Sequence, residues 1–431
     1  MKYNSSVYYN NIMNKMNKVC FIGLGYVGLP TAALMASKGI NVYGVDINKK
    51  AVDTINKGES HIEEPDLQKI ISETVAKGSL KAGTKPEIAD IFIIAVPTPL
   101  YADKSTDLSY VLKASESISA YLQKGNLVIL ESTSPVGTTE KIKNYIAKLR
   151  SDLNFEGDKP DVLFAYCPER ILPGNSIEEL KTNSRSIGGL TKEAALRAKE
   201  PYASFCTAEL VLTNARTAEM TKLVENSFRD VNIAFANELS IICDKQELDV
   251  QEVIALANRH PRVNILKPST GVGGHCISVD PWFIVSENKE DAKLIYQARL
   301  INDYKPKYIA QKIINLALKK NINKTTILGL TYKPNVDDFR ESPAFEVIAE
   351  LFEKSELEIF VNDPFINKLG KLDDRLNKIE LENIDSSYIV LINTPHSEYQ
   401  DIQINSDKII DPSGFLKTST KSNFEKNILK T

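Results

Sequence analysis

The chain has 431 residues, of which 42% are hydrophobic and 25% are charged, and its formal net charge is −3 at pH 7. This composition is typical of a globular protein of about two or three domains, and the charge excludes the basic footprint of a nucleic-acid partner. No apolar run reaches the length of a bilayer-spanning helix, so no membrane partner is expected. Five scattered cysteines and four histidines predict neither disulfides nor a metal site, and they favour a reducing, cytoplasmic location.

The order of predicted elements indicates an α/β protein with a helical centre. Residues 1–16 are polar and are expected to form a disordered extension, with Met13 or Met16 as alternative start sites. An α/β domain is predicted over residues 17–213, a helical region over 214–320 and a second α/β domain over 321–431.

A dinucleotide-binding fingerprint opens the first α/β domain. A strand predicted over residues 18–22 leads into G-x-G-x-x-G, a helix, and a second strand over 41–45 that ends in Asp46. The glycines let backbone approach a pyrophosphate at the helix N-terminus, and the acid binds the adenosine ribose and repels a 2′-phosphate. The sequence therefore predicts NAD, and the alternative is a βαβ unit that binds no phosphate. The expected contacts are Gly23, Gly25, Tyr26, Val27, Gly28 and Asp46.

Polar residues follow the next predicted strands, where ligands of open α/β sheets bind. Apolar runs over residues 88–96 and 126–130 predict buried parallel strands, followed by Thr98 and Thr133. These hydroxyls are expected either to bind the nicotinamide half of NAD or to cap a helix. A strand over 162–166 precedes Glu169 and Arg170, which are adjacent on a loop that either contacts substrate or forms a solvated ion pair.

Residues 214–247 contain no glycine or proline and predict one long helix. Lys222, Asn226 and Arg229 share a face, which is either solvated or the wall of an anionic pocket. The apolar residues are spread over more than one face, which suits a dimer interface. Those expected to supply core are Leu223, Val224, Phe228, Ile233 and Phe235.

A basic loop and a glycine-cysteine loop follow. Residues 258–264 include His260 and Arg262, and arginine can grip phosphate with two hydrogen bonds. Residues 271–282 place Cys276 after a run of glycines and Asp280 four residues later. A cysteine held on such a loop can be exposed and act as a thiolate nucleophile. The alternative is a glycine-rich surface turn with an incidental buried cysteine.

Two helices, over residues 289–302 and 307–321, are predicted before the second α/β domain. Its strands are expected over residues 325–330, 356–361, 388–392 and 408–410, with a helix over 344–354. This domain lacks the glycine fingerprint, so it is expected to bind something other than a second dinucleotide.

Together these motifs, over residues 17–417, resemble the UDP-sugar 6-dehydrogenase family. The resemblance implies an N-terminal Rossmann NAD-binding domain, a long central helix that forms a homodimer, and a C-terminal Rossmann-like domain that binds the UDP part of a UDP-sugar. It also implies oxidation of the sugar C6 alcohol to a carboxylate with two NAD. Residues 258–264 and 279–283 resemble the branch that acts on UDP-N-acetyl-D-mannosamine.

The resemblance also implies roles for individual residues. Cys276 would form a thiohemiacetal and then a thioester, and Lys222 would favour the thiolate. Asn226 would assist the oxyanion, while Asp280 and Glu169 would activate water. Arg340 would contact the cofactor. The expected substrate contacts are Arg170, Ile171, Lys222, Asn226, Arg229, His260, Arg262, Gly271, Tyr332 and Lys333.

Three other functions are also compatible with these motifs. The same chemistry fits UDP-N-acetylglucosamine or UDP-glucose. A β-hydroxyacid dehydrogenase shares a Rossmann domain and a lysine on a long helix, but it needs neither Cys276 nor the C-terminal domain. A non-catalytic NAD-binding protein would bind without turnover, and the combination of Lys222, Cys276 and Asp280 argues against it.

Overall fold

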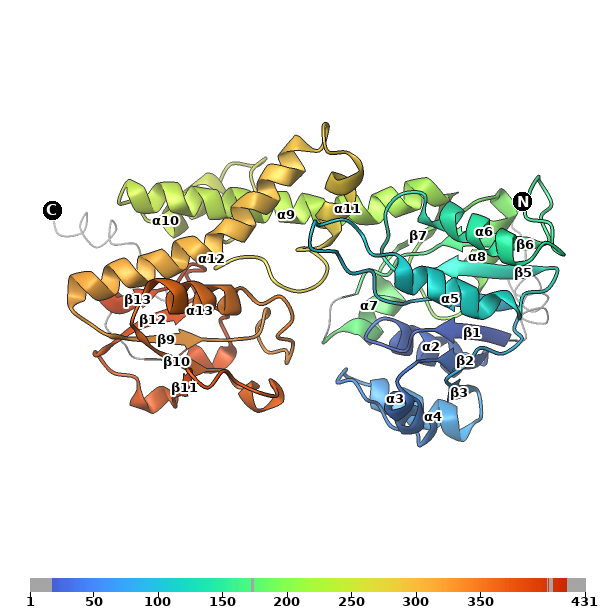
Figure 1. The fold of residues 1–431 in the computed structure, drawn as a ribbon, viewed down its shortest axis with the longest axis horizontal. Coiled ribbons are helices and arrows are strands. Elements are labelled where there is room, and N and C mark those ends of the chain that lie inside the picture. Colours follow the sequence, from blue (N-terminus) through green and yellow to red (C-terminus); the bar gives the residue numbers. More distant parts are fainter. Residues whose placement is uncertain (1–17, 172–173, 401, 403–405, 417–431) are drawn as a thin grey trace. The chain divides into compact units, whose positions relative to one another are not determined.

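The computed structural model describes residues 18–171, 174–400, 402 and 406–416 (Figure 1). The expected extension over residues 1–16 lies outside these ranges. The chain divides into two compact units, Met1–Val224 and Glu225–Thr431, and each is considered by itself. Within the described ranges, no helix combines the length and the hydropathy that crossing a bilayer requires.

An eight-stranded sheet forms the centre of the first unit (Figure 1). Its strand order is β3-β2-β1-β4-β5-β6-β7-β8, and all neighbours are parallel except the antiparallel pair β6 and β7. The first six positions have the strand order of the dinucleotide-binding fold, in which the order reverses between β1 and β4. The strands are β1 (Lys18–Ile22), β2 (Asn41–Val45), β3 (Leu80–Gly83), β4 (Ile91–Ile94), β5 (Asn126–Leu130), β6 (Val162–Tyr166), β7 (Arg185–Gly189) and β8 (Leu210–Asn214).

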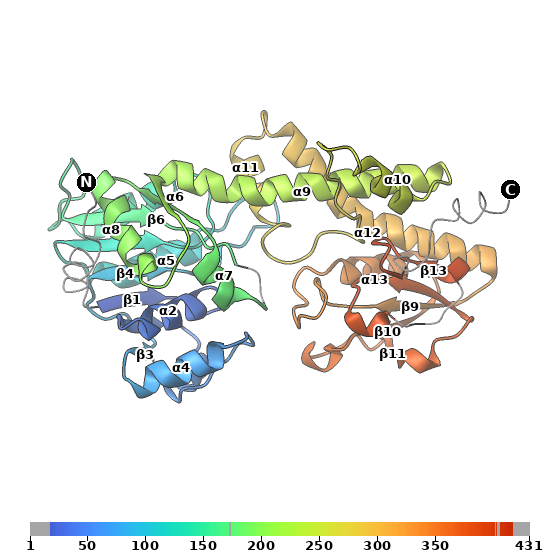
Figure 2. The ribbon, with the colours of Figure 1, turned by 180° about the vertical axis from the view of Figure 1, so that it is seen from behind.

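Helices cover both faces of this sheet, so successive residues of each central strand are buried on opposite sides. In β1, Val19 and Phe21 pack with α2, α4, α7 and α8, whereas Cys20 and Ile22 pack with α5 and α6. These helices are labelled in Figures 1 and 2. The helices are α2 (Gly28–Ser37), α3 (Lys49–Asn56), α4 (Leu67–Ala76), α5 (Ser109–Ser119), α6 (Thr138–Leu149), α7 (Ser176–Thr182) and α8 (Lys192–Ala203).

Strand β4 is shorter than the predicted strand over residues 88–96. Ile88 is 58% exposed. At the other end, the Val96 N–H donates to the Ser132 hydroxyl at 2.9 Å, where a longer strand would need a backbone partner. The strand therefore ends at Ile94, and the residues after it form a loop at the carboxyl edge of the sheet.

Long helices dominate the start of the second unit, and α9 (Ala215–Lys245) passes through the division between the units. The predicted break near residue 306 is wrong, because α12 continues through Pro306. The helix is held on both sides of this proline: Arg299 is buried before it and Ile309 after it, and Lys305 donates to the Ser240 hydroxyl. The other helices here are α10 (Val250–Ala257), α11 (Asp280–Glu287) and α12 (Lys293–Lys320).

The prediction that Val224, Phe228 and Phe235 supply core is also wrong, because they are 49%, 70% and 54% exposed. Leu223 is buried, as expected, and Ile233 is partly buried. In the second unit the buried face of α9 is made of small and polar residues, which leaves the large apolar side chains on the outside. The buried set includes Asp230, Ala234, Asn237 and Ser240.

A polar ladder of buried side chains joins α9 to α12. Arg299 donates to Asp230 at 2.6 Å, and Asn302 also donates to Asp230, at 2.8 Å. Asn302 then accepts from Asn237 at 2.9 Å. The Asn237 amide oxygen accepts the backbone N–H of Ser269 at 2.8 Å. The ladder therefore also anchors the segment that leads into the glycine-cysteine loop.

A five-stranded parallel sheet completes the second unit, in the order β11-β10-β9-β12-β13. Helices α12 and α13 (Pro343–Lys354) cover one face. The strands are β9 (Lys324–Leu328), β10 (Glu358–Asn362), β11 (Asn377–Lys378), β12 (Tyr388–Ile392) and β13 (Ile409–Ile410). Short 3-10 turns lie at η1 (Ile366–Lys368), η2 (Leu381–Asn383), η3 (Ser397–Tyr399) and η4 (Ser406–Lys408).

Candidate active site

The glycine loop between β1 and α2 is shaped for a dinucleotide. Gly23 has a φ of +95°, and a Cβ there would lie 2.3 Å from the Ala95 carbonyl oxygen. A Cβ on Gly28 would lie 2.0 Å from the Gly23 carbonyl oxygen. A Cβ on Gly25, in contrast, would meet nothing within 4 Å. Gly23 and Gly28 thus close a tight turn, and Gly25 faces open space in which a pyrophosphate fits.

Asp46 lies at the carboxyl end of β2, beside this loop. Its carboxylate accepts the backbone N–H groups of Leu24 at 3.0 Å and Asn48 at 2.8 Å. Tyr26 and Val27 form the turn before α2, with Val27 as its N-cap residue. The oriented carboxylate and the open loop fit the ribose and the pyrophosphate of NAD.

The two threonines that follow β4 and β5 are brought together. The Thr98 hydroxyl donates to the Thr133 carbonyl oxygen at 2.7 Å. Ser132 reinforces this link, because its hydroxyl donates to the Val96 carbonyl oxygen at 2.7 Å. Neither threonine caps a helix; they fix two loops at the carboxyl edge of the sheet.

Glu219, which the sequence reasoning missed, closes the N-terminus of α6. It is fully buried, and it accepts the N–H groups of Gly137 at 2.5 Å and Thr139 at 2.8 Å together with the Thr139 hydroxyl at 2.7 Å. A carboxylate satisfies the donors of a helix N-terminus well. Lys222 lies three residues further along α9, so this contact fixes the part of the helix that carries Lys222.

A buried charge cluster lies where β5 and β6 end. Glu169 is 7% exposed, and its carboxylate accepts from Arg185 at 2.7 Å. A Glu131 carboxylate oxygen lies 3.8 Å from the same guanidinium, but within the described residues neither Glu131 oxygen accepts a hydrogen bond. Burial, and then the charge of Glu169, raise the pKa of Glu131.

The solvated Glu169–Arg170 pair is therefore not formed. Arg170 donates instead to the Ser184 carbonyl oxygen at 2.8 Å and to the Ser186 hydroxyl at 3.0 Å. Arg185 and Glu131 were both missed by the sequence reasoning. A signal was present for Glu131, because it directly follows a predicted buried strand.

Cys276 is the exposed cysteine of the five, and the other four are buried. Burial raises the pKa of Cys20 to about 11 and that of Cys167 to about 12, so both stay protonated near neutral pH. The alternative of an incidental buried cysteine in a surface turn is wrong, because the Cys276 side chain reaches solvent. It is the thiol of this chain best placed to react with a substrate.

Three of the predicted catalytic residues meet within the second unit. The Asp280 backbone N–H donates to the Cys276 carbonyl oxygen at 2.8 Å, and Asp280 begins α11. The Asp280 carboxylate is 3% exposed and accepts from the Asn226 side chain at 2.5 Å. The hydrogen bonds therefore join the cysteine loop, the start of α11 and α9.

The glycines of the cysteine loop allow a close approach to the loop between β9 and α13. A Cβ on Gly273 would lie 2.7 Å from the Tyr332 Cβ, and one on Gly274 would lie 2.9 Å from the Tyr332 ring. The Gly274 N–H donates to the Arg340 carbonyl oxygen at 3.1 Å. The Arg340 guanidinium pairs with Asp338, with a 2.8 Å hydrogen bond from Nε. The two loops are therefore in close contact at Tyr332.

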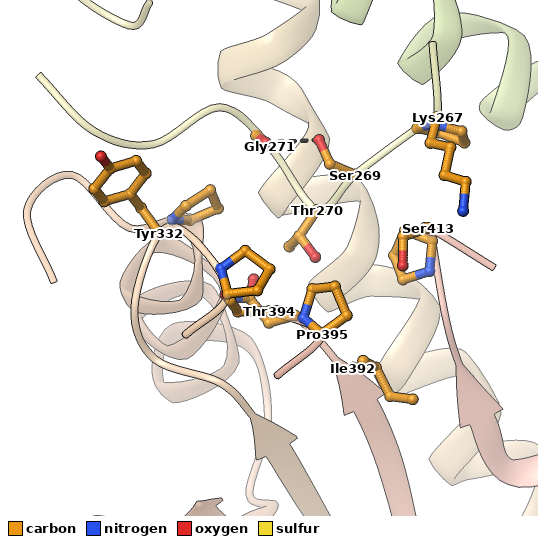
Figure 3. A pocket seen from close by; sticks show the side chains of 14 residues that line it. Lys267, Ser269, Thr270, Gly271, Tyr332, Ile392, Thr394, Pro395 and Ser413 are labelled. Carbon is orange, nitrogen blue, oxygen red and sulfur yellow. Dashed lines mark hydrogen bonds between the residues drawn. The ribbon is translucent and has the colours of Figure 1, made fainter. Parts of the chain in front are cut away.

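A pocket of about 250 Å³ lies at the carboxyl ends of β9 and β12 (Figure 3). This is the switch point of the five-stranded sheet, where ligands of such sheets bind. Ser269 donates to the Gly271 carbonyl oxygen at 2.7 Å along one wall. Of the predicted substrate residues, Gly271 and Tyr332 line the pocket. Other lining residues are Lys267, Asn393, Thr394 and Ser413.

The basic loop is fixed at its base and exposed at its tip. The Asn258 side chain donates to the Ile265 carbonyl oxygen at 3.0 Å and accepts the Ile265 N–H at 2.7 Å. His260, Arg262 and also Arg229 on α9 are exposed. The described lining of the pocket includes none of these three residues.

The fold and these features define an NAD-binding dehydrogenase with a second nucleotide-type domain and a cysteine loop. The chain belongs to the UDP-glucose/GDP-mannose dehydrogenase family. Its NAD binding domain matches residues 17–206, its central domain residues 216–304 and its UDP binding domain residues 326–418. The expected fold class, cofactor and family are thereby confirmed.

Several relatives are similar over nearly the whole chain. A UDP-N-acetyl-D-mannosamine dehydrogenase of Campylobacter jejuni is 52% identical, over 92% of this chain and 99% of the relative. An NDP-N-acetyl-D-galactosaminuronic acid dehydrogenase of Ralstonia nicotianae is 46% identical, over 92% and 95%. The solved UDP-N-acetyl-mannosamine dehydrogenase Cap5O of Staphylococcus aureus has a TM-score of 0.83 and 41% identity, with 94% of this chain and 97% of that chain covered.

Proposed function

We propose that this chain oxidises the C6 alcohol of UDP-N-acetyl-D-mannosamine to the carboxylate of UDP-N-acetyl-D-mannosaminuronate with two NAD, in the synthesis of cell-surface polysaccharide precursors. The observation that carries this proposal is the exposed Cys276 on a loop interlocked with Tyr332, which lines the pocket of the UDP binding domain. The identity to the Campylobacter jejuni relative supports the choice of sugar. The Ralstonia relative keeps a second N-acetylated sugar as the alternative.

The proposed chemistry divides between a thiol and the groups around it. When bound, NAD would supply the hydride acceptor: one NAD molecule would take a hydride from the alcohol, and a second would take one from the cysteine adduct. The Cys276 thiolate adds to the C6 aldehyde to form a thiohemiacetal, whose oxidation leaves a thioester. Lys222 favours the thiolate and, with Asn226, stabilises the oxyanion. Water then attacks the thioester, a carboxylate forms and the thiolate is released.

Asp280 and Glu169 are the proposed groups that position or deprotonate this water. Asp280 is oriented by Asn226. Glu169 is ion-paired with Arg185 at 2.7 Å. Acid–base assistance of this kind contributes roughly 10²–10⁴-fold to a reaction.

The proposed recognition residues surround the nucleotide and the sugar. The diphosphate and sugar are assigned to Arg170, Ile171, Arg229, His260 and Arg262, and the UDP half to Gly271, Tyr332 and Lys333. NAD is assigned to Thr98, Thr133 and Arg340 in addition to the glycine loop and Asp46. The corresponding domain limits are 17–213, 214–320 and 321–431.

The test is NADH release with NAD and a panel of UDP-N-acetyl-D-mannosamine, UDP-N-acetylglucosamine, UDP-N-acetylgalactosamine and UDP-glucose. About two NADH per UDP-N-acetyl-D-mannosamine, with little from the others, is expected from the four-electron oxidation. Two NADH from another sugar would keep the reaction and change the substrate. One NADH per sugar would contradict the thioester route. No NADH from any sugar would favour a non-catalytic NAD-binding protein.

Replacing Asp46 with alanine is expected to weaken NAD binding and relax the preference over NADP. The carboxylate is the proposed ribose acceptor, and hydrogen bonds to charged groups contribute about 1.5–3 kcal/mol, or roughly 10–100-fold in KM for NAD. Steady-state kinetics with both cofactors measure this effect. Asp53→Ala, at an exposed acid on α3, is the matched control. An unchanged preference in Asp46→Ala would assign ribose recognition to another group.

A homodimer is also proposed, through the exposed apolar face of α9. Phe228, Phe235 and Ile242 are 70%, 54% and 45% exposed and recur every seven residues, so they lie on one side of the helix. Sedimentation velocity tests the assembly, and a species of 48.0 kDa at all concentrations would exclude it.

The cytoplasm is the proposed location of the protein. Fractionation of cells that express the tagged chain tests this location, and recovery of the chain with membranes or outside the cell would contradict it.

A further inference from the structure

A buried histidine joins three neighbouring strands of the second sheet beside the pocket. His396 is fully buried and follows β12. Thr331, also fully buried, follows β9, and Asp363, which is 3% exposed, follows β10. Because β10, β9 and β12 are adjacent and parallel, these three side chains meet at one carboxyl edge.

The hydrogen bonds around the imidazole define the role of each nitrogen. The Asn335 backbone N–H donates to His396 Nδ1 at 3.0 Å, so Nδ1 is the acceptor. Nε2 lies 3.0 Å from the Thr331 hydroxyl and 3.2 Å from the Asp363 carboxylate. The carboxylate also accepts the N–H groups of Leu330 at 2.6 Å and Thr331 at 3.1 Å. Nε2–H is therefore the donor, and the imidazole is held from both sides.

The segment held in this way is loop 331–335, which carries Tyr332. The Thr331 hydroxyl donates to the Lys333 carbonyl oxygen at 3.1 Å. Asn335 has a φ of +59°, a left-handed conformation that few non-glycine residues adopt. Its side-chain oxygen accepts the Ser397 N–H at 3.2 Å. The loop therefore turns around the imidazole, and Tyr332 and Pro334 of this loop line the pocket.

We propose that His396 is a positioning residue for the nucleotide half of the substrate. It holds loop 331–335 in the conformation that receives the uridine diphosphate, and it touches neither the reacting carbon nor Cys276. This inference rests on the proposed function, because it takes the pocket as the UDP site. It assigns to His396 an effect on substrate affinity and none on the chemical steps.

The test compares His396→Phe with wild type for binding of UDP alone and for the kinetics of the full chain. Phenylalanine keeps a ring against Tyr399, which lies edge-on at 5.5 Å between ring centroids, but it provides neither nitrogen. The Asn335 N–H then loses its acceptor, and the Asp363 carboxylate loses one of its donors. A rise of about tenfold or more in the Kd of UDP and in KM for the UDP-sugar is expected, with kcat and KM for NAD within about twofold.

Two further variants make the result specific. In His396→Asn, the amide oxygen replaces Nδ1 as acceptor for Asn335, so a smaller rise in KM than in His396→Phe is expected. Thr325→Val is the matched control, because it removes a buried hydrogen bond, 3.0 Å to the Ile389 carbonyl oxygen, at the opposite end of β9. Its Kd for UDP is expected to equal that of wild type. If His396→Phe fails to fold, the comparison of His396→Asn with Thr325→Val decides the question.

The outcomes separate this inference from the function on which it rests. UDP binding by wild type with the same Kd in the His396 variants would overturn the role of His396 and leave the function standing. An equal rise in Thr325→Val, or a fall in kcat with unchanged KM in the His396 variants, would also overturn it. No UDP binding by wild type would remove the nucleotide site itself.

Discussion

Cys276→Ser is expected to abolish formation of the sugar acid while NAD still binds. An ordinary thiol has a pKa of about 8.5, so a nearby cation can populate its thiolate near neutral pH, whereas a serine hydroxyl stays protonated. Loss of a nucleophile lowers kcat by several orders of magnitude. NADH release and product analysis measure the loss, and titration with NAD checks that the first unit is intact.

Cys206→Ser is the matched control for this change. Cys206 is buried, and its thiol donates to the Asn183 carbonyl oxygen at 3.5 Å, a bond that a serine hydroxyl can replace. Activity close to wild type is expected. Wild-type acid formation by Cys276→Ser would remove the thioester route, and loss of activity in both variants would point to a general effect on folding.

Arg185→Leu is expected to give the largest loss of stability. Arg185 is 2% exposed and lies between Glu169, at 2.7 Å, and Glu131, at 3.8 Å. Without it, two buried carboxyl groups lose the guanidinium that lies between them, and removal of one partner of a buried ion pair costs about 3–5 kcal/mol. Urea unfolding at several pH values measures the change. Arg216→Leu breaks the exposed pair with Glu140 and is expected to cost at most about 1 kcal/mol.

The loss should grow with pH. Burial raises the pKa of Glu131 above its unfolded value of about 4.3, so the native state binds this proton more tightly than the unfolded chain. This contribution to stability is complete below about pH 4.3 and is lost as pH rises through the native pKa. Arg185 lowers the pKa of Glu131, so in Arg185→Leu the native-state pKa rises further and stability falls over a wider pH range. Adding Glu131→Gln removes this titrating group and should recover part of the lost stability. A pH-independent loss equal to that of Arg216→Leu would contradict the buried-charge explanation.

Elements with strong local signals were predictable from the sequence. The strand, glycine loop, helix and Asp46 are adjacent in the chain, so their chemistry can be read without knowing the fold. The continuity of α12 through Pro306 was not predictable, because it depends on packing of residues on both sides of the proline. The exposure of Phe228 and Phe235 was missed for a related reason: the buried face of α9 is polar, and only its partner α12 shows why.

The candidate site was predictable where its residues lie on glycine-rich or basic loops. Glu169 was found, but its partner Arg185 was not, because an ion pair between residues sixteen positions apart leaves no local pattern. Asp363 and His396 each follow a predicted strand of the second domain. Placing the residues that follow adjacent strands side by side would have drawn attention to them, because parallel strands end at a common edge.

The polar ladder between α9 and α12 also fixes how far one helix can slide along the other. Apolar contacts between helices tolerate a shift by one turn, whereas buried charged and amide groups pair in a single registry. One turn is about 5.4 Å, more than the reach of any hydrogen bond. The Ser269 N–H donates to the Asn237 side chain, so the same registry also determines the position of the pocket wall that contains Gly271. We therefore expect substitutions among related chains to preserve the spacing of Asp230, Asn237, Arg299 and Asn302 more than the identity of the apolar residues between them.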